Sequence, residues 1–173
     1  MSARESIIPV FVPHLGCPND CVFCNQRRIS GSTVPAAAAD VDKAIEQAAA
    51  LPRTGAKRQL AFYGGSFTAI PVPQQTALLA AAKRHLDAGE IDAVRLSTRP
   101  DAIDAAVLAR LSEYGVETIE LGAQSMCDEV LALSGRGHTA ADVENASRMI
   151  RAAGFRLILQ MMTGLPGDTP ERC

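Results

Sequence analysis

The sequence of 173 residues has the length of a single domain, and a compact fold of this size buries about 70% of the unfolded chain's surface. With 47% hydrophobic and 21% charged residues, the composition is that of a soluble globular protein, and no apolar run reaches the roughly 18 residues that a membrane span requires. The net charge of −2 gives no electrostatic argument for nucleic-acid binding by the whole chain, although it is compatible with a local basic patch.

Five apolar and β-branched runs are predicted as strands. In chain order they are 7–13, 59–65, 93–98, 116–122 and 155–164. Most are continuously apolar rather than alternating in polarity, which is typical of parallel strands covered on both faces. We therefore expect a parallel sheet.

Stretches with helical spacing lie between these runs, over 36–51 and 102–114. In the first, Val41, Ile45 and Ala48 share one face. Thr139, with Asp142 three residues later, resembles a capping box that begins another helix, and Gly154 is its expected end. The alternation indicates an α/β fold of about five βα units.

Each predicted strand runs into a segment rich in glycine, serine or polar residues. These segments are HLGCPNDCVFCNQ, GGSF, STRPD, GAQS and TGLPGDT. Because the carboxyl ends of parallel strands lie on one rim, the five segments are expected to meet at one site. After the last of them the chain ends where a further helix and strand are expected, so we expect it to be truncated.

The first of these segments contains three of the five cysteines, Cys17, Cys21 and Cys24, spaced Cys-x3-Cys-x2-Cys. The first residues make a poor signal peptide, so we expect a cytoplasmic protein, in which clustered cysteines bind metal more often than they form disulfides. Zinc usually takes paired ligands, and a closed iron–sulfur site needs four thiolates. The other candidate ligands form no such pair: Cys127, Cys173, His14, His85 and His138. A three-thiolate loop fits a 4Fe-4S cluster in which one iron lacks a protein ligand and is available to a substrate or cofactor.

This spacing, with the aromatic Phe23 before the last cysteine, resembles the signature of radical S-adenosylmethionine (SAM) enzymes. The strings VPHLGCPNDCVFCNQRRISG, FYGGSFTAIP, STRPDAI, ELGAQSM, GRGHTAADV and TGLPGDT resemble, in order, the branch with the catalytic subunit of Elongator and the oxygen-independent coproporphyrinogen oxidases. The resemblance covers about residues 7 to 170. It implies a partial (βα)6 TIM-like barrel, with 1–173 as a radical SAM core domain that lacks its last strand and any following domain. A chain extended by another strand–helix unit is then expected to be more soluble or more stable.

In that family three cysteines hold the cluster, and the open iron binds the amino and carboxylate groups of SAM. Reductive cleavage then gives a 5′-deoxyadenosyl radical that abstracts hydrogen from the substrate. The resemblance implies Cys17, Cys21 and Cys24 as the cluster ligands and an electron donor such as ferredoxin or flavodoxin. It leaves the substrate open between tRNA modification and tetrapyrrole chemistry. A non-catalytic iron–sulfur or zinc protein is the alternative from another class.

The resemblance also implies contacts to SAM. Phe23 matches an aromatic that packs near the adenine, although it could equally cap the loop against the core. Gly64-Gly65-Ser66 matches the glycine motif whose backbone binds the amino group, where close approach tolerates no Cβ. Arg136 matches an arginine that faces the SAM carboxylate; without the family, a solvated loop arginine is the favoured interpretation.

Three further positions are implied near the ribose. Gln124 matches a polar contact there, with a structural role at the strand end as the alternative. Ser97 and Gln160 stand where relatives often carry an acid. Arg99 could serve the ribose in place of Ser97, or could pair with Asp101. Three other positions carry structural expectations: His14 packs near the loop, Cys127 begins a helix, and Arg27-Arg28 forms a solvated face.

Overall fold

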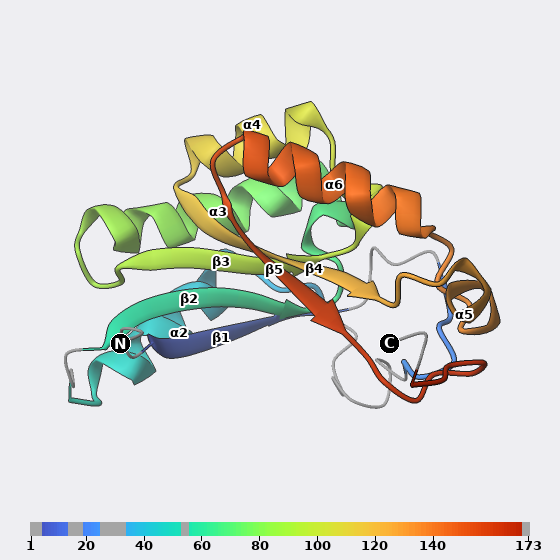
Figure 1. The fold of residues 1–173 in the computed structure, drawn as a ribbon. Helices are drawn as coiled ribbons and strands as arrows, with labels where there is room; N and C mark the ends of the chain where they lie inside the picture. The colour runs from blue at the N-terminus through green and yellow to red at the C-terminus, as the bar shows by residue number, and fades with distance from the viewer. Residues whose placement is uncertain (1–4, 14–18, 25–33, 53–55, 171–173) are drawn as a thin grey trace.

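The computed structural model describes residues 5–13, 19–24, 34–52 and 56–170 (Figure 1). Five strands form one sheet in the order β1-β2-β3-β4-β5, and every neighbouring pair is parallel. Their bounds are β1 Glu5–Val12, β2 Lys57–Gly64, β3 Ala93–Thr98, β4 Val116–Gln124 and β5 Arg156–Met161. The spatial order follows the chain order, as in a βα barrel. The predicted α/β fold of five strands is confirmed, as a partial barrel.

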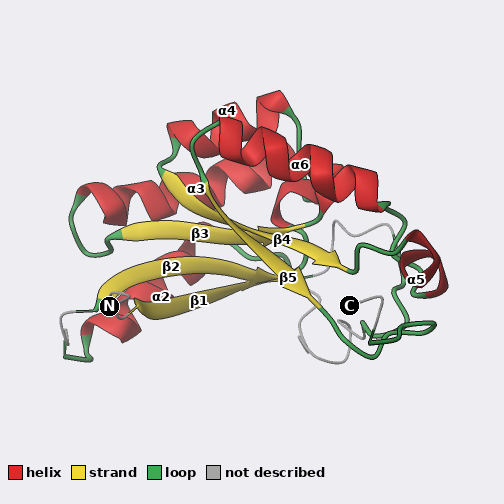
Figure 2. Cartoon of the chain, in the orientation of Figure 1, coloured by secondary structure: helices red, strands yellow, loops and turns green. Residues whose placement is uncertain are grey.

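The helices α2, α3, α4 and α6 pack against the sheet, whereas α5 lies beyond its end (Figure 2). Their bounds are α2 Ala38–Ala49, α3 Val72–Asp87, α4 Ala105–Glu113, α5 Asp128–Leu133 and α6 Ala140–Ala152, with short 3-10 turns at Phe67–Ala69 and Pro100–Ala102. The capping box is confirmed: the Thr139 hydroxyl accepts from the Asp142 N–H, and the Asp142 carboxylate accepts from the Thr139 N–H. Cys127 stands at the start of α5, as expected. No helix in the described part of the chain is long and apolar enough to cross a membrane.

The helix α3 was not among the predicted elements, although it has 16 residues. Its buried face combines Leu78 and Leu79 with alanines and with the polar Gln75, so its apolar stripe is weak in the sequence. Gln75 is nevertheless satisfied, because its Nε2 donates to the carbonyls of Thr68 and Ile70 at 3.0 and 2.7 Å. Tertiary packing therefore decides this helix more than periodicity does.

The hydrophobic core lies between the helices and the outward face of the sheet. Leu60 and Phe62 of β2, Leu96 of β3 and Ile119 of β4 are almost fully buried there. The ring centroids of Phe62 and Phe67 are 4.8 Å apart. Burying side chains of this size contributes about 2 kcal/mol each, which fixes the strands under their helices.

The expectation that the strands are covered on both faces holds for the three central strands and is wrong for the two edges. β1 alternates, with Val10 buried and Phe11 61% exposed. On β5, Leu159 and Met161 are 44% and 48% exposed. Phe11 is exposed because it lies on the inner face of β1, which borders the open barrel. Leu159 is in register with the core residue Leu121 and therefore faces outward, and it is exposed because β5 is the edge of the sheet.

The inner face is polar. Thr118 and Glu120 of β4 point inward, between Ile119 and Leu121, which join the core. The register of β4 shifts at Glu117 against β3, and again between Gly122 and Gln124 against β5. The second irregularity lies at the carboxyl end of β4, on the rim of the sheet.

Candidate functional site

A pocket of about 300 Å³ opens at the carboxyl ends of the strands. Four loops and the last strand contribute to it, as expected from the parallel topology. Its lining consists of Cys21, Phe23, Cys24, Tyr63, Gly64, Gly65, Ser66, Ser97, Thr98, Arg99, Gly122, Gln124, Arg136 and Gln160. Every predicted site residue that the structure describes therefore lies in one pocket. The segment TGLPGDT does not line it; β5 contributes Gln160 instead.

Two of the predicted cluster ligands are described. Cys21 is buried and Cys24 is partly exposed. The Cys24 N–H donates to the Cys21 carbonyl at 2.8 Å, which closes a turn between them. Cys17 lies outside the described residues, as do His14, Arg27, Arg28 and Cys173. Within the described ranges no three cysteine, histidine or acidic residues group as a metal site. Two thiols on one turn beside a pocket suit the donor chemistry of an iron–sulfur cluster.

Arg136 lies against this turn and is 8% exposed, so the interpretation as a solvated loop arginine is wrong. Its Nη1 lies 3.6 Å from the Cys21 Sγ, and its Nη2 donates to the Gly122 carbonyl at 2.6 Å. The guanidinium carbon lies 5.9 Å from the ring centroid of Phe23, within cation–π range. The Nε has no partner among the described residues and keeps one donor unused. An arginine in this position suits an anionic group in the pocket.

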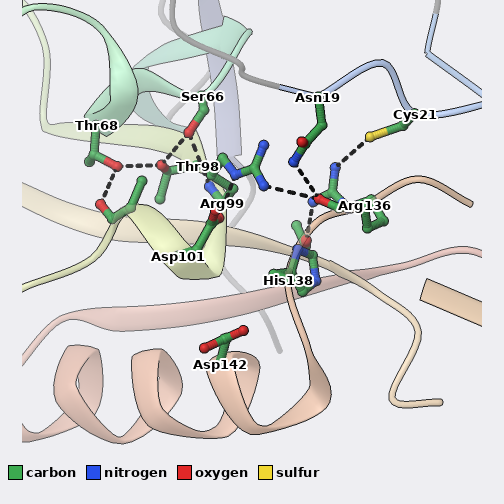
Figure 3. A network of polar contacts seen from close by, with 12 residues as sticks. Asn19, Cys21, Ser66, Thr68, Thr98, Arg99, Asp101, Arg136, His138 and Asp142 are labelled. Carbon is green, nitrogen blue, oxygen red and sulfur yellow. Dashed lines mark hydrogen bonds and ion pairs between the residues drawn. The ribbon is translucent and has the colours of Figure 1, made fainter. Parts of the chain in front are cut away.

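The backbone around Arg136 is fixed as well (Figure 3). Its carbonyl accepts from the side-chain amide of Asn19 at 2.8 Å and from Arg99 Nη2 at 3.0 Å. Arg99 also pairs through its Nε with Asp101, which was one of its two expected roles. Asn19 was not predicted, because nothing in its sequence context indicates a partner 117 residues away.

The glycine motif has the backbone that its sequence predicts. Gly64 has a φ of +107°, and a Cβ built on it would lie 2.9 Å from the Val12 carbonyl oxygen. The Gly65 N–H donates to the same carbonyl at 2.9 Å. Ser66 is buried, with its Oγ 2.9 Å from the Thr98 Oγ1. The loop after β2 is thereby bound to the ends of both neighbouring strands.

Gln124 ends β4 in a left-handed backbone conformation, with a φ of +69°. It is the only residue other than glycine with positive φ in the described part of the chain. Such a conformation is uncommon for a non-glycine residue and recurs at functional sites. Together with the register shift before it, it directs Gln124 into the pocket lining.

Ser97 and Gln160 lie close together on the pocket floor. The Gln160 Nε2 is 3.5 Å from the Ser97 Oγ and donates to the Glu120 Oε2 at 2.6 Å. Tyr63, which also lines the pocket, donates its hydroxyl to the Glu120 Oε1 at 2.8 Å. Burial, and then the hydrogen bond to Glu120, raises the pKa of Tyr63 to about 12. Tyr63 and Glu120 were not predicted; the inward parity of Glu120 on its strand was the available signal.

His138 packs under the same rim and is 4% exposed. Its Nε2 lies 3.1 Å from the Ala123 carbonyl oxygen. Burial lowers the pKa of His138, and the charge of Arg136 lowers it further. A neutral histidine that donates to a backbone carbonyl is a structural support for the end of β4.

The family model described as the radical SAM superfamily matches residues 11–173. A tRNA uridine(34) acetyltransferase from Dehalococcoides mccartyi is 36% identical over 77 residues, which are 44% of this chain and 17% of that protein.

Two solved structures share the fold. The Elp3 of Methanocaldococcus infernus superposes with a TM-score of 0.71 at 21% identity, over 98% of this chain and 40% of the other. The coproporphyrinogen III oxidase HemN of Escherichia coli gives a TM-score of 0.67 at 24% identity, with the same coverages of 98% and 40%. The chain spans less than half the length of each of these three relatives. Since the family model covers nearly the whole chain, the protein belongs to the radical SAM superfamily.

Proposed function

We propose that this chain is a radical SAM enzyme core that holds a 4Fe-4S cluster through Cys17, Cys21 and Cys24. The observation that carries the proposal is the pocket that contains Cys21, Cys24 and all the described residues implied as SAM contacts. When bound, the cluster and SAM supply reductive cleavage to a 5′-deoxyadenosyl radical for hydrogen abstraction from a substrate. The electron comes from a donor such as ferredoxin or flavodoxin, in the cytoplasm.

The residues of the chain divide the work of binding. Gly64 adopts a φ of +107°, which glycine tolerates, and this lets the loop after β2 turn closely against the Val12 carbonyl. The backbone of this motif would bind the amino group of SAM through carbonyl oxygens, since an ammonium group only donates. Arg136 offers its guanidinium to the carboxylate, and Phe23 contacts that guanidinium beside the adenine site. Gln124 and Gln160 present amides to the ribose. The hydroxyl of Ser97 would hydrogen-bond the same sugar.

For the substrate we favour tRNA, the molecule that appears in the name of the acetyltransferase relative. The described cations of the inner wall are already compensated by acids: Arg95 with Glu120, Arg156 with Glu5 and Lys57 with Glu117. A coproporphyrinogen carries four carboxylates and requires cations to bind them, which this part of the wall does not offer. A neutral nucleobase needs only hydrogen bonds. The acetyl transfer of the relative is not part of the proposal.

The proposed domain is the whole of 1–173, with a further strand beside β5. Leu159 and Met161 of β5 are about half exposed. No described residue pairs with the outer edge of β5. A protein extended through another strand–helix unit should melt at a higher temperature than the 173-residue chain. Equal melting temperatures would contradict this.

The proposed function is tested by anaerobic reconstitution with iron and sulfide. We expect about four irons and four sulfides per chain, and 5′-deoxyadenosine on addition of SAM and dithionite. Cys21→Ser and Cys24→Ser should lose the iron. Cys127→Ser is the matched control, because Cys127 is also a partly exposed cysteine but begins α5 outside the pocket. A protein that carries the cluster but binds no SAM would overturn the proposal, and zinc without iron would favour a non-catalytic metal protein.

A further inference from the structure

The carboxylate of Glu120 lies beneath the pocket floor and gathers side chains from three other strands. Its Oε1 accepts from the Tyr63 hydroxyl of β2 at 2.8 Å, and the Arg95 Nε of β3 lies 2.8 Å from the same oxygen. Its Oε2 accepts from the Gln160 amide of β5 at 2.6 Å. Glu120 itself is 7% exposed and is not among the lining residues of the pocket. It therefore acts on the pocket through the residues that it binds.

Two of these three partners face the pocket directly, Tyr63 and Gln160. An ionised carboxylate can only accept hydrogen bonds, so Tyr63 must donate to it and Gln160 must turn its NH₂ group toward it. The second N–H of that amide is directed at the Ser97 hydroxyl, 3.5 Å away. The carbonyl oxygen of Gln160 is then the group left for the pocket. Through these hydrogen bonds, Glu120 leaves acceptor oxygens on the pocket floor. Such acceptors suit a hydroxyl or an N–H of a ligand.

The charge of Glu120 is compensated along a chain of side chains on the inner face. Arg95 is buried and lies between Glu120 and Glu5, whose Oε2 is 3.4 Å from the Arg95 Nη1. Glu5 in turn pairs with Arg156 at 2.7 Å. This series of ion pairs connects β1, β3, β4 and β5. The position of Glu120 is therefore fixed by several strands of the sheet and not by its own strand alone.

We propose that Glu120 is a positioning residue of this pocket, which orients the hydroxyl of Tyr63 and the amide of Gln160 for the ligand that the pocket binds. The proposal rests on the proposed function, since that ligand is SAM. It assigns Glu120 no contact with SAM, and it predicts that loss of the carboxylate changes the affinity of the pocket without changing its lining.

The test is a binding measurement on the reconstituted 173-residue chain, with SAM as the probe and calorimetry as the readout. Glu120→Gln keeps the size of the side chain but replaces one acceptor oxygen by an NH₂ group. We expect the Kd for SAM to rise about tenfold, the effect of losing one hydrogen bond to a charged group. Glu117→Gln is the matched control: it is a glutamate of the same strand, paired at 2.6 Å with Lys57, but neither residue of that pair lines the pocket. Its Kd should stay within about twofold of wild type.

A second measurement separates positioning from a general loss of structure. In a Tyr63→Phe/Gln160→Met background, Glu120→Gln should raise the Kd by less than about twofold, because the residues through which it acts are already changed. If Glu120→Gln does not fold, the double variant Glu120→Gln/Arg95→Gln takes its place, because it leaves the net charge unchanged. An unchanged Kd, or the same increase in both backgrounds, would overturn the inference while the proposed function stands. A wild-type protein that carries its cluster but binds no SAM would instead overturn the function itself.

Discussion

Glu5 and Arg156 join the first and the last strand of the sheet. The Glu5 carboxylate accepts from the Arg156 Nη1 at 2.7 Å, across 151 residues of sequence. Since β1 and β5 are opposite edges in the strand order, the sheet curls until its edges approach each other at the amino-terminal ends of the strands. Side chains, and not backbone pairing, close that end of the partial barrel.

We expect Glu5→Gln to lower the free energy of unfolding at pH 7 by no more than about 1 kcal/mol, the range for ion pairs in contact with water. The hydrogen bond from Arg156 holds the pKa of Glu5 below its usual 4.5. A carboxyl with a lowered pKa contributes stability that is present above pH 4.5 and is lost as the pH falls through its folded-state pKa. Urea unfolding of both proteins at neutral and acidic pH should therefore show the difference shrinking on acidification. Asp87→Asn, which removes an exposed pair within α3, should change stability less.

His85 predicts a pH dependence of the opposite sign. Its Nε2 lies 2.8 Å from the Asp42 Oδ1 of α2, and its Nδ1 contacts Glu90 beyond α3. Burial lowers the pKa of His85, but the hydrogen bonds to Glu90 and Asp42 outweigh burial and raise it above its usual 6.5. The stabilisation is complete below pH 6.5 and is lost as the pH rises through the raised pKa. The melting temperature of wild type should exceed that of His85→Asn most on the acidic side.

His138 serves as the internal control for that titration. Burial lowers the pKa of His138, so the folded protein favours the neutral form of this side chain. Its contribution to stability is therefore lost as the pH falls below 6.5. The His85→Asn protein should therefore show a melting temperature that declines on acidification. A profile of His85→Asn that still declines toward alkaline pH like wild type would show that His85 is not the titrating group.

Gly64→Ala tests the backbone of the loop after β2. The new Cβ would lie 2.9 Å from the Val12 carbonyl oxygen, and alanine would have to adopt a φ of +107°. We therefore expect the free energy of unfolding to fall by about 3 kcal/mol. Gly154→Ala is the control, because it shares a positive φ of +87° but has nothing within 4 Å of the added carbon. It should cost about 1–2 kcal/mol, the left-handed penalty alone. Chemical denaturation measures both, and equal losses would show that the contact with Val12 relaxes freely.

Arg136→Lys should loosen the cysteine turn without unfolding the protein. A lysine ammonium is a point charge that cannot reproduce the planar contacts to Gly122, Cys21 and Phe23 together. The reporter is the Val22 N–H, which donates to the Ser134 carbonyl at 3.1 Å. We expect its hydrogen exchange to accelerate about tenfold, while amides in the middle of β3 keep their rates. Uniform acceleration in both places would indicate global destabilisation instead.

The sequence predicts the strands well, because continuous apolar runs between turn-forming residues are a strong local signal. It also predicts the rim, since the carboxyl ends of parallel strands share one edge of the sheet. The partners across the inner face are different. That Glu120 meets Tyr63, Arg95 and Gln160 depends on the register of three strand pairs, and the shift at Glu117 leaves no trace in the residue pattern. The burial of Arg136 likewise depends on how its loop folds over the cysteine turn.

The contact between that turn and the loop that carries Arg136 has a consequence for the order of assembly. Val22 and Asn19 are held by Ser134 and Arg136, more than 100 residues later in the chain. Small zinc domains fold around their metal, which organises the ligands from an unfolded state. Here the contacts of the cysteine turn with Ser134 and Arg136 exist only when β4 and the loop after it are in place. The proposed cluster would thus be loaded late, onto a chain that has already folded.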